Sequence, residues 1–428
     1  MIIKLKRVLT LVKKFWTALK YGGWNYAIKK AKNYVELDIT RFRSRTLTKT
    51  QEIQRPPIYP TKVSEASDVV DIININFYDW NGEILYKGGA ERYVYDLACL
   101  LKENGWRPRI LQNANKPFTK EFKGFPVWGI PLADTRKFEV MSEKYREICA
   151  GSHFVIASPL DLACKLGGLR VIGINHGIYW DGPKAMVKPL EEYKHLFDAV
   201  RAAQVVVAVD TNFINWLRTY DYQLALKAVY IPNYFDESRF FPVNKDFSGK
   251  IRILYPRRLY EPRGIFITLE AFKILLEKYP DIELHLVGQA NETDTKIVSQ
   301  FVKEHAPRVM WEEFDMEDMD KVYRLSHIVL IPTLYAEGTS LSCLEAMATN
   351  NAIIATHVGG LPNLVINGYN GILISPTAQS LITAVETLLN DRQQMANMAN
   401  NGVLLSTAFK KQRWQQQWQN IIEQVAKA

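Results

Sequence analysis

Two glutamates flank a turn of small residues at positions 337–345, where the sequence reads EGTSLSCLE. The segment follows an apolar run at 328–332 that is typical of a buried strand. A strand, a small-residue turn and a helix start together form an anion site, because backbone N–H groups can approach a phosphate at the positive end of the helix. We therefore expect Gly338, Thr339, Ser340 and Leu341 to line a site for a diphosphate.

The two carboxylates lie on either side of this turn, so each could accept hydrogen bonds from sugar hydroxyls. Glu337 precedes the turn and would reach a hexose, whereas Glu345 lies within the helix and would reach a ribose. Both residues have a structural alternative. Ser342 and Glu345 fit the S-x-x-E capping box of a helix start, and Glu337 could be a solvated loop acid.

Arginines follow another apolar run, at residues 251–255. Arg258 and Arg263 could hold a diphosphate and stabilise the charge that develops as it leaves, without a metal ion. The alternative is a pair of surface arginines at a strand end. Asp318 and Asp320 match the D-x-D motif of metal sites, but acids are also typical of the first turn of a helix. We expect no metal site there.

These motifs resemble those of the family-four retaining glycosyltransferases of GT-B fold, the glycosyl transferases group 1. The segment EGTSLSCLEAMATNNAIIATHVGGLPNLV is similar to the E-x7-E element of that family. The segment PRRL, followed by Arg263 and Gly264, is similar to its Gly-Arg-Leu…Lys-Gly element. Two residues depart from that element, since Arg257 stands where the family usually has glycine and Arg263 where it usually has lysine.

Further segments extend the resemblance to about residues 69–410. They are Ile231-Pro232-Asn233 with Asp236, which resembles the interdomain Pro-Asn-Gly…Asp stretch; Gly288, which resembles a strand-end glycine beside the nucleotide; and the GGLP loop at 359–362. In the first domain, Gly88 and Gly89 resemble the glycine loop that opens its first helix, although a plain helix start is the alternative.

His176 follows the apolar run at 171–175 and precedes a glycine, which places it at the carboxyl end of a strand. A histidine there could donate a hydrogen bond to a sugar hydroxyl or shape the acceptor pocket. The alternative is a hydrogen-bonded structural histidine. A similar His-Gly position in the family favours the functional interpretation.

The elements that must position these residues are short apolar runs alternating with helical patterns, which indicate parallel sheets covered on both faces. Runs occur at 69–77, 108–112, 127–131, 154–157, 171–175, 205–209, 251–255, 283–287, 328–332, 352–355 and 371–374. A pause at 231–250 separates two α/β domains. We expect a basic extension and linker at 1–60, an acceptor domain at 61–235 and a nucleotide-sugar domain at 236–408. A C-terminal helix at 409–428 is expected to return to the acceptor domain.

The net charge of +9 is concentrated at the N-terminus. Residues 1–50 carry thirteen Lys and Arg but only two acids, so the other 378 residues have a net charge of −2. Apolar residues recur there at helical spacing beside lysines, which predicts a basic amphipathic helix on an anionic membrane surface. Packing on the body and nucleic-acid binding are the alternatives, and we expect no nucleic acid and no cleaved signal peptide.

Four scattered cysteines without a C-x-x-C pair indicate a reducing compartment with buried thiols. The resemblance implies retaining transfer of a hexosyl unit from a nucleoside-diphosphate sugar to a hydroxyl of a glycan or lipid-linked acceptor. The basic segment at 1–50 suggests a lipid-linked acceptor and a cytoplasmic enzyme on the inner membrane face, in polysaccharide biosynthesis, and we expect no cofactor and no metal. The rivals are a nucleotide-sugar epimerase of GT-B fold and a non-catalytic nucleic-acid-binding scaffold. The implied catalytic residues are His176, Arg258, Arg263 and Glu337, with donor contacts from Gly88, Gly89, Gly288 and residues 338–341 and 345.

Overall fold

A computed structural model of the chain describes residues 67–86, 88–132, 137–181 and 190–427. Two parallel sheets organise these residues, one before and one after residue 240. The two Rossmann-like α/β domains expected from the resemblance are therefore confirmed. The basic helix and linker expected within residues 1–60 lie outside the described residues. No helix among the described residues is both long and apolar enough to cross a membrane.

The first sheet has eight strands in the order β3-β4-β2-β1-β5-β6-β7-β8. All its pairings are parallel except that of β3 with β4. Its strands are β1 (Val69–Asn74), β2 (Arg107–Ala114), β3 (Phe118–Phe122), β4 (Phe125–Pro131), β5 (Phe154–Ser158), β6 (Val171–Asn175), β7 (Val205–Ala208) and β8 (Ala228–Tyr230). Its helices are α2 (Gly89–Glu103), α3 (Phe138–Ile148), α4 (Lys194–Ala202), α5 (Thr211–Tyr220) and α6 (Tyr222–Ala225).

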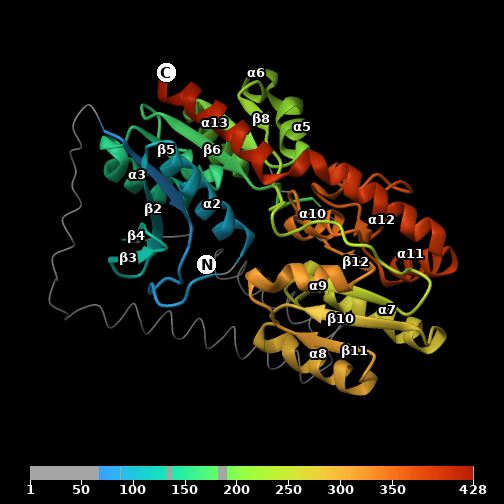
Figure 1. Ribbon diagram of the computed structural model, residues 1–428. Helices are drawn as coiled ribbons and strands as arrows, with labels where there is room; N and C mark the ends of the chain where they lie inside the picture. Colours follow the sequence, from blue (N-terminus) through green and yellow to red (C-terminus); the bar gives the residue numbers. More distant parts are fainter. Residues whose placement is uncertain (1–66, 87, 133–136, 182–189, 428) are drawn as a thin grey trace, which may run out of the picture. The chain divides into compact units, whose positions relative to one another are not determined.

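The second sheet has six parallel strands in the order β11-β10-β9-β12-β13-β14. They are β9 (Ile251–Pro256), β10 (Ile282–Val287), β11 (Val309–Glu312), β12 (Ile328–Ile331), β13 (Ala352–Thr356) and β14 (Gly371–Ile374). Its helices are α7 (Ile265–Lys278), α8 (Glu292–His305), α9 (Met319–Leu325), α10 (Leu341–Ala348), α11 (Ala378–Asn390) and α12 (Arg392–Ser406). Figure 1 labels most of these elements.

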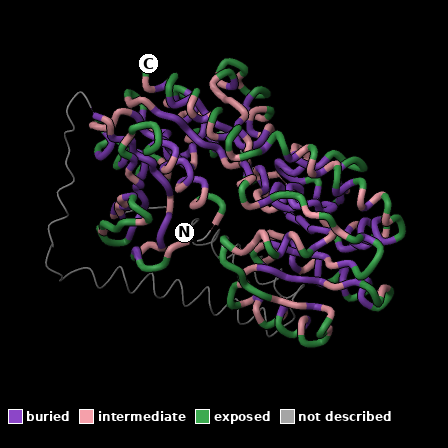
Figure 2. Tube along the Cα trace, in the orientation of Figure 1, coloured by how far each residue is buried: buried purple, intermediate pink, exposed green. Residues whose placement is uncertain are grey.

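Each sheet is buried on both faces, which explains why its central strands are apolar throughout. In β1, Ile72 belongs to one buried cluster and Ile73 to another, so successive side chains enter different cores. Leu254 and Tyr255 of β9 divide in the same way. Figure 2 shows the strands as the most continuously buried segments, with helices buried on one side.

The last helix, α13 (Lys411–Lys427), packs against the first sheet although the second sheet precedes it. Trp414 and Trp418 are buried in the cluster that contains β1 and α2. The indole N–H of Trp418 donates to the hydroxyl of Tyr93 at 2.8 Å. The chain therefore crosses between the two halves twice, once near Phe235 and once near Lys410, and these crossings form a β-bridge with each other.

The four cysteines are free thiols, as the sequence indicates. Cys149, Cys164 and Cys343 are buried and Cys99 is half-buried. Burial raises the pKa of both Cys164 and Cys343 to about 12, so these thiols stay protonated at neutral pH.

Candidate active site

The small-residue turn ends at the N-terminus of α10. Ser340 is the N-cap, and its hydroxyl accepts a hydrogen bond from the N–H of Cys343 at 3.4 Å. Ser342 lies inside the helix, and its hydroxyl donates to the carbonyl of Pro256 at 3.2 Å. The capping-box alternative for Ser342 and Glu345 is therefore wrong, because Ser340 and not Ser342 caps the helix.

Glu337 lies in a buried cluster with two arginines and a threonine. Its Oε2 accepts from Nη2 of Arg257 at 2.6 Å, from Nη1 of Arg263 at 2.5 Å and from the Thr333 hydroxyl at 2.8 Å. Arg257 also donates to the Thr333 hydroxyl. Three donors converge on one carboxylate oxygen, so the side chain of Glu337 has a fixed orientation.

The charges of this cluster determine its protonation. Burial alone would raise the pKa of Glu337, but the guanidinium groups of Arg257 and Arg263 outweigh it and lower the pKa. The Glu337 charge in turn raises the pKa of Arg263 against the effect of burial. Glu337 is therefore a carboxylate, and Arg263 is a cation, at neutral pH.

Arg258 does not join the Glu337 cluster. A Cβ placed on Gly88 would lie 3.1 Å from Nη2 of Arg258, and a Cβ placed on Gly89 would lie 3.1 Å from Cδ1 of Leu341. The glycine loop that opens α2 thus faces Arg258 and the start of α10. The backbone of this loop can come close to a ligand there because no side chain projects from it.

Glu345 pairs with a residue that the sequence did not single out. Its Oε1 accepts from Nη1 of Arg92 in α2 at 2.6 Å, and both side chains are buried. The pair joins helices that belong to different sheets.

His176 lies at the end of β6, where its Nε2 is 2.9 Å from the hydroxyl of Ser158. Its ring contacts the ring of Tyr93 edge to face, with centroids 5.4 Å apart. Burial lowers the pKa of His176 to about 4, so the imidazole is neutral at neutral pH. It can act through hydrogen bonds but carries no charge to offer a phosphate.

The loops at the ends of β6 and β7 contact the loops of the second sheet directly. A Cβ on Gly338 would overlap the carbonyl oxygen of His176, so only glycine permits this approach. The carboxylate of Asp181 accepts from the N–H of Gly359 at 2.7 Å. The side-chain amide of Asn363 donates to the hydroxyl of Thr211 at 2.9 Å.

Gly288 and Asn233 each contact a segment of the site. Gly288 follows β10 with φ of +145°, and a Cβ there would overlap the carbonyl of Arg257. The side-chain amide of Asn233 donates to the carbonyl of Thr339 at 2.6 Å. Gly288 therefore lies beside the segment that carries Arg257 and Arg258, and Asn233 lies beside the small-residue turn at 337–341.

The D-x-D motif forms ion pairs with basic side chains. Asp318 binds Lys321 at 2.7 Å, and Asp320 binds Arg324 at 3.1 Å. Among the described residues, no group of three or more His, Cys, Asp or Glu side chains has the geometry of a metal site.

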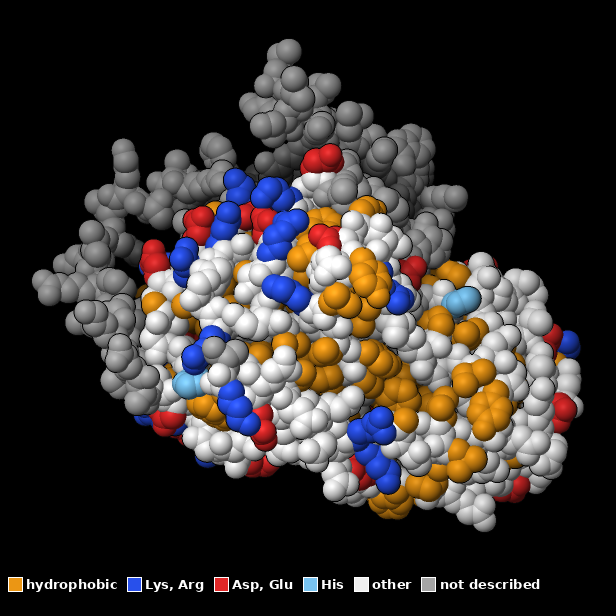
Figure 3. Space-filling model, turned by 90° about the horizontal axis from the view of Figure 1, so that it is seen from above, with side chains coloured by type: hydrophobic (Ala, Val, Ile, Leu, Met, Phe, Trp, Pro, Cys, Tyr) orange, Lys and Arg blue, Asp and Glu red, His pale blue; other side chains and the backbone are white. Residues whose placement is uncertain are grey.

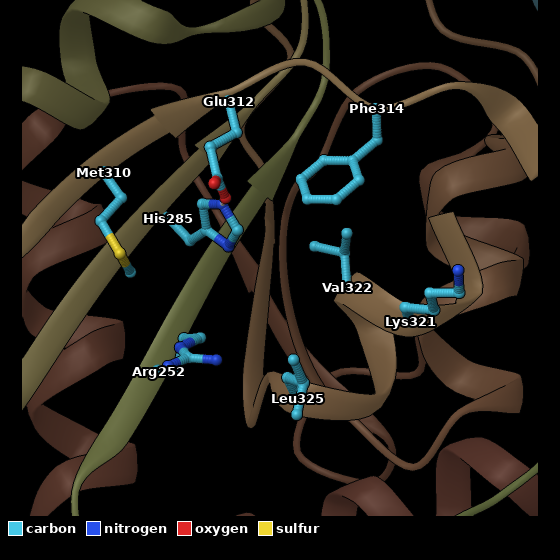
Figure 4. Close-up of a pocket in the computed structure, with 8 residues that line it drawn as sticks. All are labelled: Arg252, His285, Met310, Glu312, Phe314, Lys321, Val322 and Leu325. Carbon is cyan, nitrogen blue, oxygen red and sulfur yellow. The ribbon is translucent and has the colours of Figure 1, made fainter. Parts of the chain in front are cut away.

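A pocket of about 160 Å³ lies on another part of the second sheet. Figure 4 shows its lining, in which the imidazole of His285 points toward the carboxylate of Glu312. These two groups are 2.6 Å apart, and the rest of the lining is largely apolar. The pocket shares no lining residue with the arginines and glutamates described above.

Sequence reasoning missed the partners that hold the predicted residues. Arg257 was noted only as a departure from the family pattern, yet it binds Glu337. The one sequence feature that could have identified Arg92 is its position directly after the glycine loop, in the string GGAER. Asp181 and Thr333 carry no local motif, because their contacts join segments that are distant in the sequence.

Residues 236–404 match the family model of the glycosyl transferases group 1. Mannosylfructose-phosphate synthase of Agrobacterium fabrum is 28% identical over 207 residues, which cover 44% of this chain and 45% of that protein. Lipopolysaccharide 1,2-N-acetylglucosaminetransferase of Salmonella typhimurium is 27% identical over 185 residues, covering 40% and 47%. The matched segments thus span less than half the length of these curated relatives.

Solved structures share the fold over most of the chain. Sucrose-phosphate synthase of Thermosynechococcus elongatus superposes with a TM-score of 0.67 at 20% identity, covering 83% of this chain and 98% of that one. Anabaena HepE in complex with UDP gives 0.65 at 19% identity, covering 83% and 99%. Residues 236–404, the segment that matches the model of the glycosyl transferases group 1, carry Arg257, Arg263, Glu337 and Glu345.

Proposed function

We propose that the chain is a retaining, metal-independent glycosyltransferase. It transfers a hexosyl unit from a nucleoside-diphosphate sugar to a hydroxyl of a glycan or lipid-linked acceptor. The observation that carries this proposal is the pair of buried, ion-paired carboxylates on either side of the α10 N-terminus, Glu337 with Arg263 and Glu345 with Arg92. A diphosphate between them would meet a helix start and cations, and its two sugars would each meet a carboxylate.

The relatives support a nucleotide-sugar donor. HepE has been solved with UDP-glucose, and the names of the two curated relatives describe sugar transfer or synthesis.

In the proposed reaction, the acceptor oxygen attacks the anomeric carbon on the face from which the nucleotide leaves. The bond between that carbon and the phosphate oxygen breaks, and the departing phosphate takes the acceptor proton. Arg258 and Arg263 stabilise the negative charge on the released nucleoside diphosphate, which requires no metal ion. The neutral imidazole of His176 hydrogen-bonds to a sugar hydroxyl at the meeting point of the two halves.

Glu337 orients the hexose. Arg257 and Thr333 fix its Oε2, so that its other oxygen can accept from sugar hydroxyls. Glu345 orients the ribose, and the N–H groups of residues 338–341 approach the phosphates. Gly88 and Gly89 have no side chains, so the loop that contains them can approach these phosphates from the first half of the chain.

The acceptor is lipid-linked and is reached at the cytoplasmic face of a membrane through residues 1–50, in surface polysaccharide biosynthesis. The nucleic-acid alternative has less support, because basic and acidic side chains are interspersed on the face shown in Figure 3. A continuous basic stripe is the usual footprint of nucleic-acid binding.

Turnover of Arg258→Ala and Glu337→Ala tests these roles. We expect each variant to lose at least about 100-fold in kcat, the size of effect seen when one group that stabilises a transition state is removed. A near wild-type rate in either variant would remove the role assigned to that residue. Donor supplied without acceptor should give no epimer of its sugar.

A further inference from the structure

Arg92 and Glu345 form a buried ion pair between the two halves of the chain. Nη1 of Arg92 lies 2.6 Å from Oε1 of Glu345, and the side chains are only 14% and 7% exposed. Burial opposes the charged form of Arg92, but Glu345, Tyr234 and Asp96 together outweigh it, so the pKa of Arg92 is raised. Arg92 is therefore a cation, and little solvent reaches the pair to replace either partner.

The same arginine connects Glu345 to the place where the chain crosses between its halves. Nε of Arg92 lies 3.9 Å from Asp96, one turn further along α2. Asp96 accepts from the hydroxyl of Tyr234 and, at 2.8 Å, from Nζ of Lys411. Tyr234 and Lys411 belong to the two crossing segments.

The two crossing segments are themselves hydrogen-bonded beside Asp96. The N–H of Phe235 donates to the carbonyl of Phe409 at 3.0 Å, and the N–H of Lys411 donates to the carbonyl of Phe235 at 2.9 Å. Asp96 thus holds both crossings, and Arg92 lies between Asp96 and Glu345. Arg92 is therefore one side chain through which a change at Glu345 can reach the crossings.

We propose that Arg92 is a positioning residue of the donor site, which holds Glu345 for the ribose hydroxyls and couples ribose binding to the arrangement of the two halves. This inference rests on the proposed function. Arg92 fixes Oε1, so the orientation of the carboxylate toward a vicinal diol depends on an arginine from the opposite half. The donor site is then complete only when the two halves meet as they do here.

Binding of a ribonucleoside diphosphate and of its 2′-deoxy form tests the proposal. The probe is the tightest binder among UDP, GDP and ADP, titrated by calorimetry into the full chain. A hydroxyl that donates to a carboxylate contributes a charge-assisted bond, so the wild type should prefer the ribose form by about 10-fold or more. In Arg92→Gln this preference should fall to within about 3-fold, and Arg92→Lys should recover part of it.

Arg109→Gln is the matched control. Arg109 forms a similarly buried pair with Asp71, at 2.7 Å, with side chains 12% and 0% exposed. That pair lies between β1 and β2, so its loss should weaken folding without changing the preference for ribose. Melting curves of both variants show whether each is folded at the temperature of the titration.

The outcomes separate this inference from the proposed function. If Arg92→Gln weakened binding of both nucleotides equally, Arg92 would be merely structural and the inference would be overturned, while the proposed function would stand. If the wild type itself showed no preference for ribose, the role of Glu345 in the proposed function would fail, and that of Arg92 with it.

Discussion

Arg257 and Glu337 form a buried ion pair, with Nη2 and Oε2 2.6 Å apart and side chains 7% and 9% exposed. The arginine occupies a position where the related family usually has glycine, and it directs the carboxylate that we assign to the hexose. Its side chain is held at the other end by the hydroxyl of Thr333, to which it also donates. The departure from the family pattern is thus part of the site.

Arg257→Ala should destabilise the chain by about 3 kcal/mol, because it leaves a buried carboxylate with one cation fewer. Urea unfolding measures the change. Arg107→Ala is the control, since its ion pair with Asp68 is exposed on both sides and such a pair contributes about 1 kcal/mol or less. Equal losses in the two variants would contradict the importance assigned to the buried pair.

Asp210 should make stability depend on pH. Burial raises its pKa from 3.8 to about 6, against the stabilising N–H groups of Phe213 and Asn212, and Asp181 raises it further. A raised pKa in the folded state means that stability falls as pH rises from about 4 through about 6. The shift of about 2 units corresponds to about 3 kcal/mol.

Asp210→Asn removes this ionisation while its side-chain oxygen can still accept from the start of α5. The variant should therefore gain stability relative to the wild type between pH 4 and pH 8, by up to about 3 kcal/mol. Urea unfolding at the two pH values measures the difference. If the difference in stability between the variant and the wild type were the same at pH 4 and at pH 8, Asp210 would ionise normally in the folded state.

Gly338→Ala should impair both folding and transfer. Its Cβ would overlap the carbonyl oxygen of His176 and would lie 2.9 Å from Cγ2 of Val209, so the two loops would have to separate. Gly402→Ala in α12 is the control, because a Cβ there would make only ordinary contacts, at 3.7 Å, with Met347 of α10. That substitution should stabilise the chain by up to about 1 kcal/mol. A Gly338→Ala variant with wild-type activity would argue against the close approach of the loops.

Deletion of residues 1–50 should abolish binding to vesicles that contain anionic lipid and leave donor hydrolysis intact. The segment has a net charge of +11. Its deletion removes the electrostatic attraction of these basic residues to an anionic surface. Sedimentation with vesicles of phosphatidylcholine and phosphatidylserine measures binding, and neutral vesicles are the control. A truncated chain that still sediments with the anionic vesicles would contradict the role of the segment.

The sequence predicted the central strands well because each is a continuous apolar run. It missed β3, β8 and β11, which are edge strands and lack such runs. The run at 69–77 was expected to be one strand, but β1 ends at Asn74. Its side-chain oxygen accepts from the next N–H, which turns the chain away from the ladder.

The candidate site was predictable where local chemistry identifies it and not where contacts join distant segments. The turn at 337–341 combines a strand end, small residues and a helix start, so its position followed from spacing alone. The partner of Glu345 could not be identified in this way, because Arg92 is 253 residues away. That Arg257 and Arg263 bind Glu337 while Arg258 does not likewise depends on the path of the backbone after β9.

The most direct measurement of the central claim is the thermal unfolding of the chain with a panel of uridine, guanosine, adenosine and thymidine diphosphate sugars. A ligand at about 100 times its dissociation constant adds about 2.7 kcal/mol to the stability of the folded state. We predict that at least one donor stabilises the wild type and that Arg263→Ala loses this effect. If no nucleotide sugar in the panel shifted the unfolding transition, the claim that this site binds a nucleoside diphosphate would be contradicted.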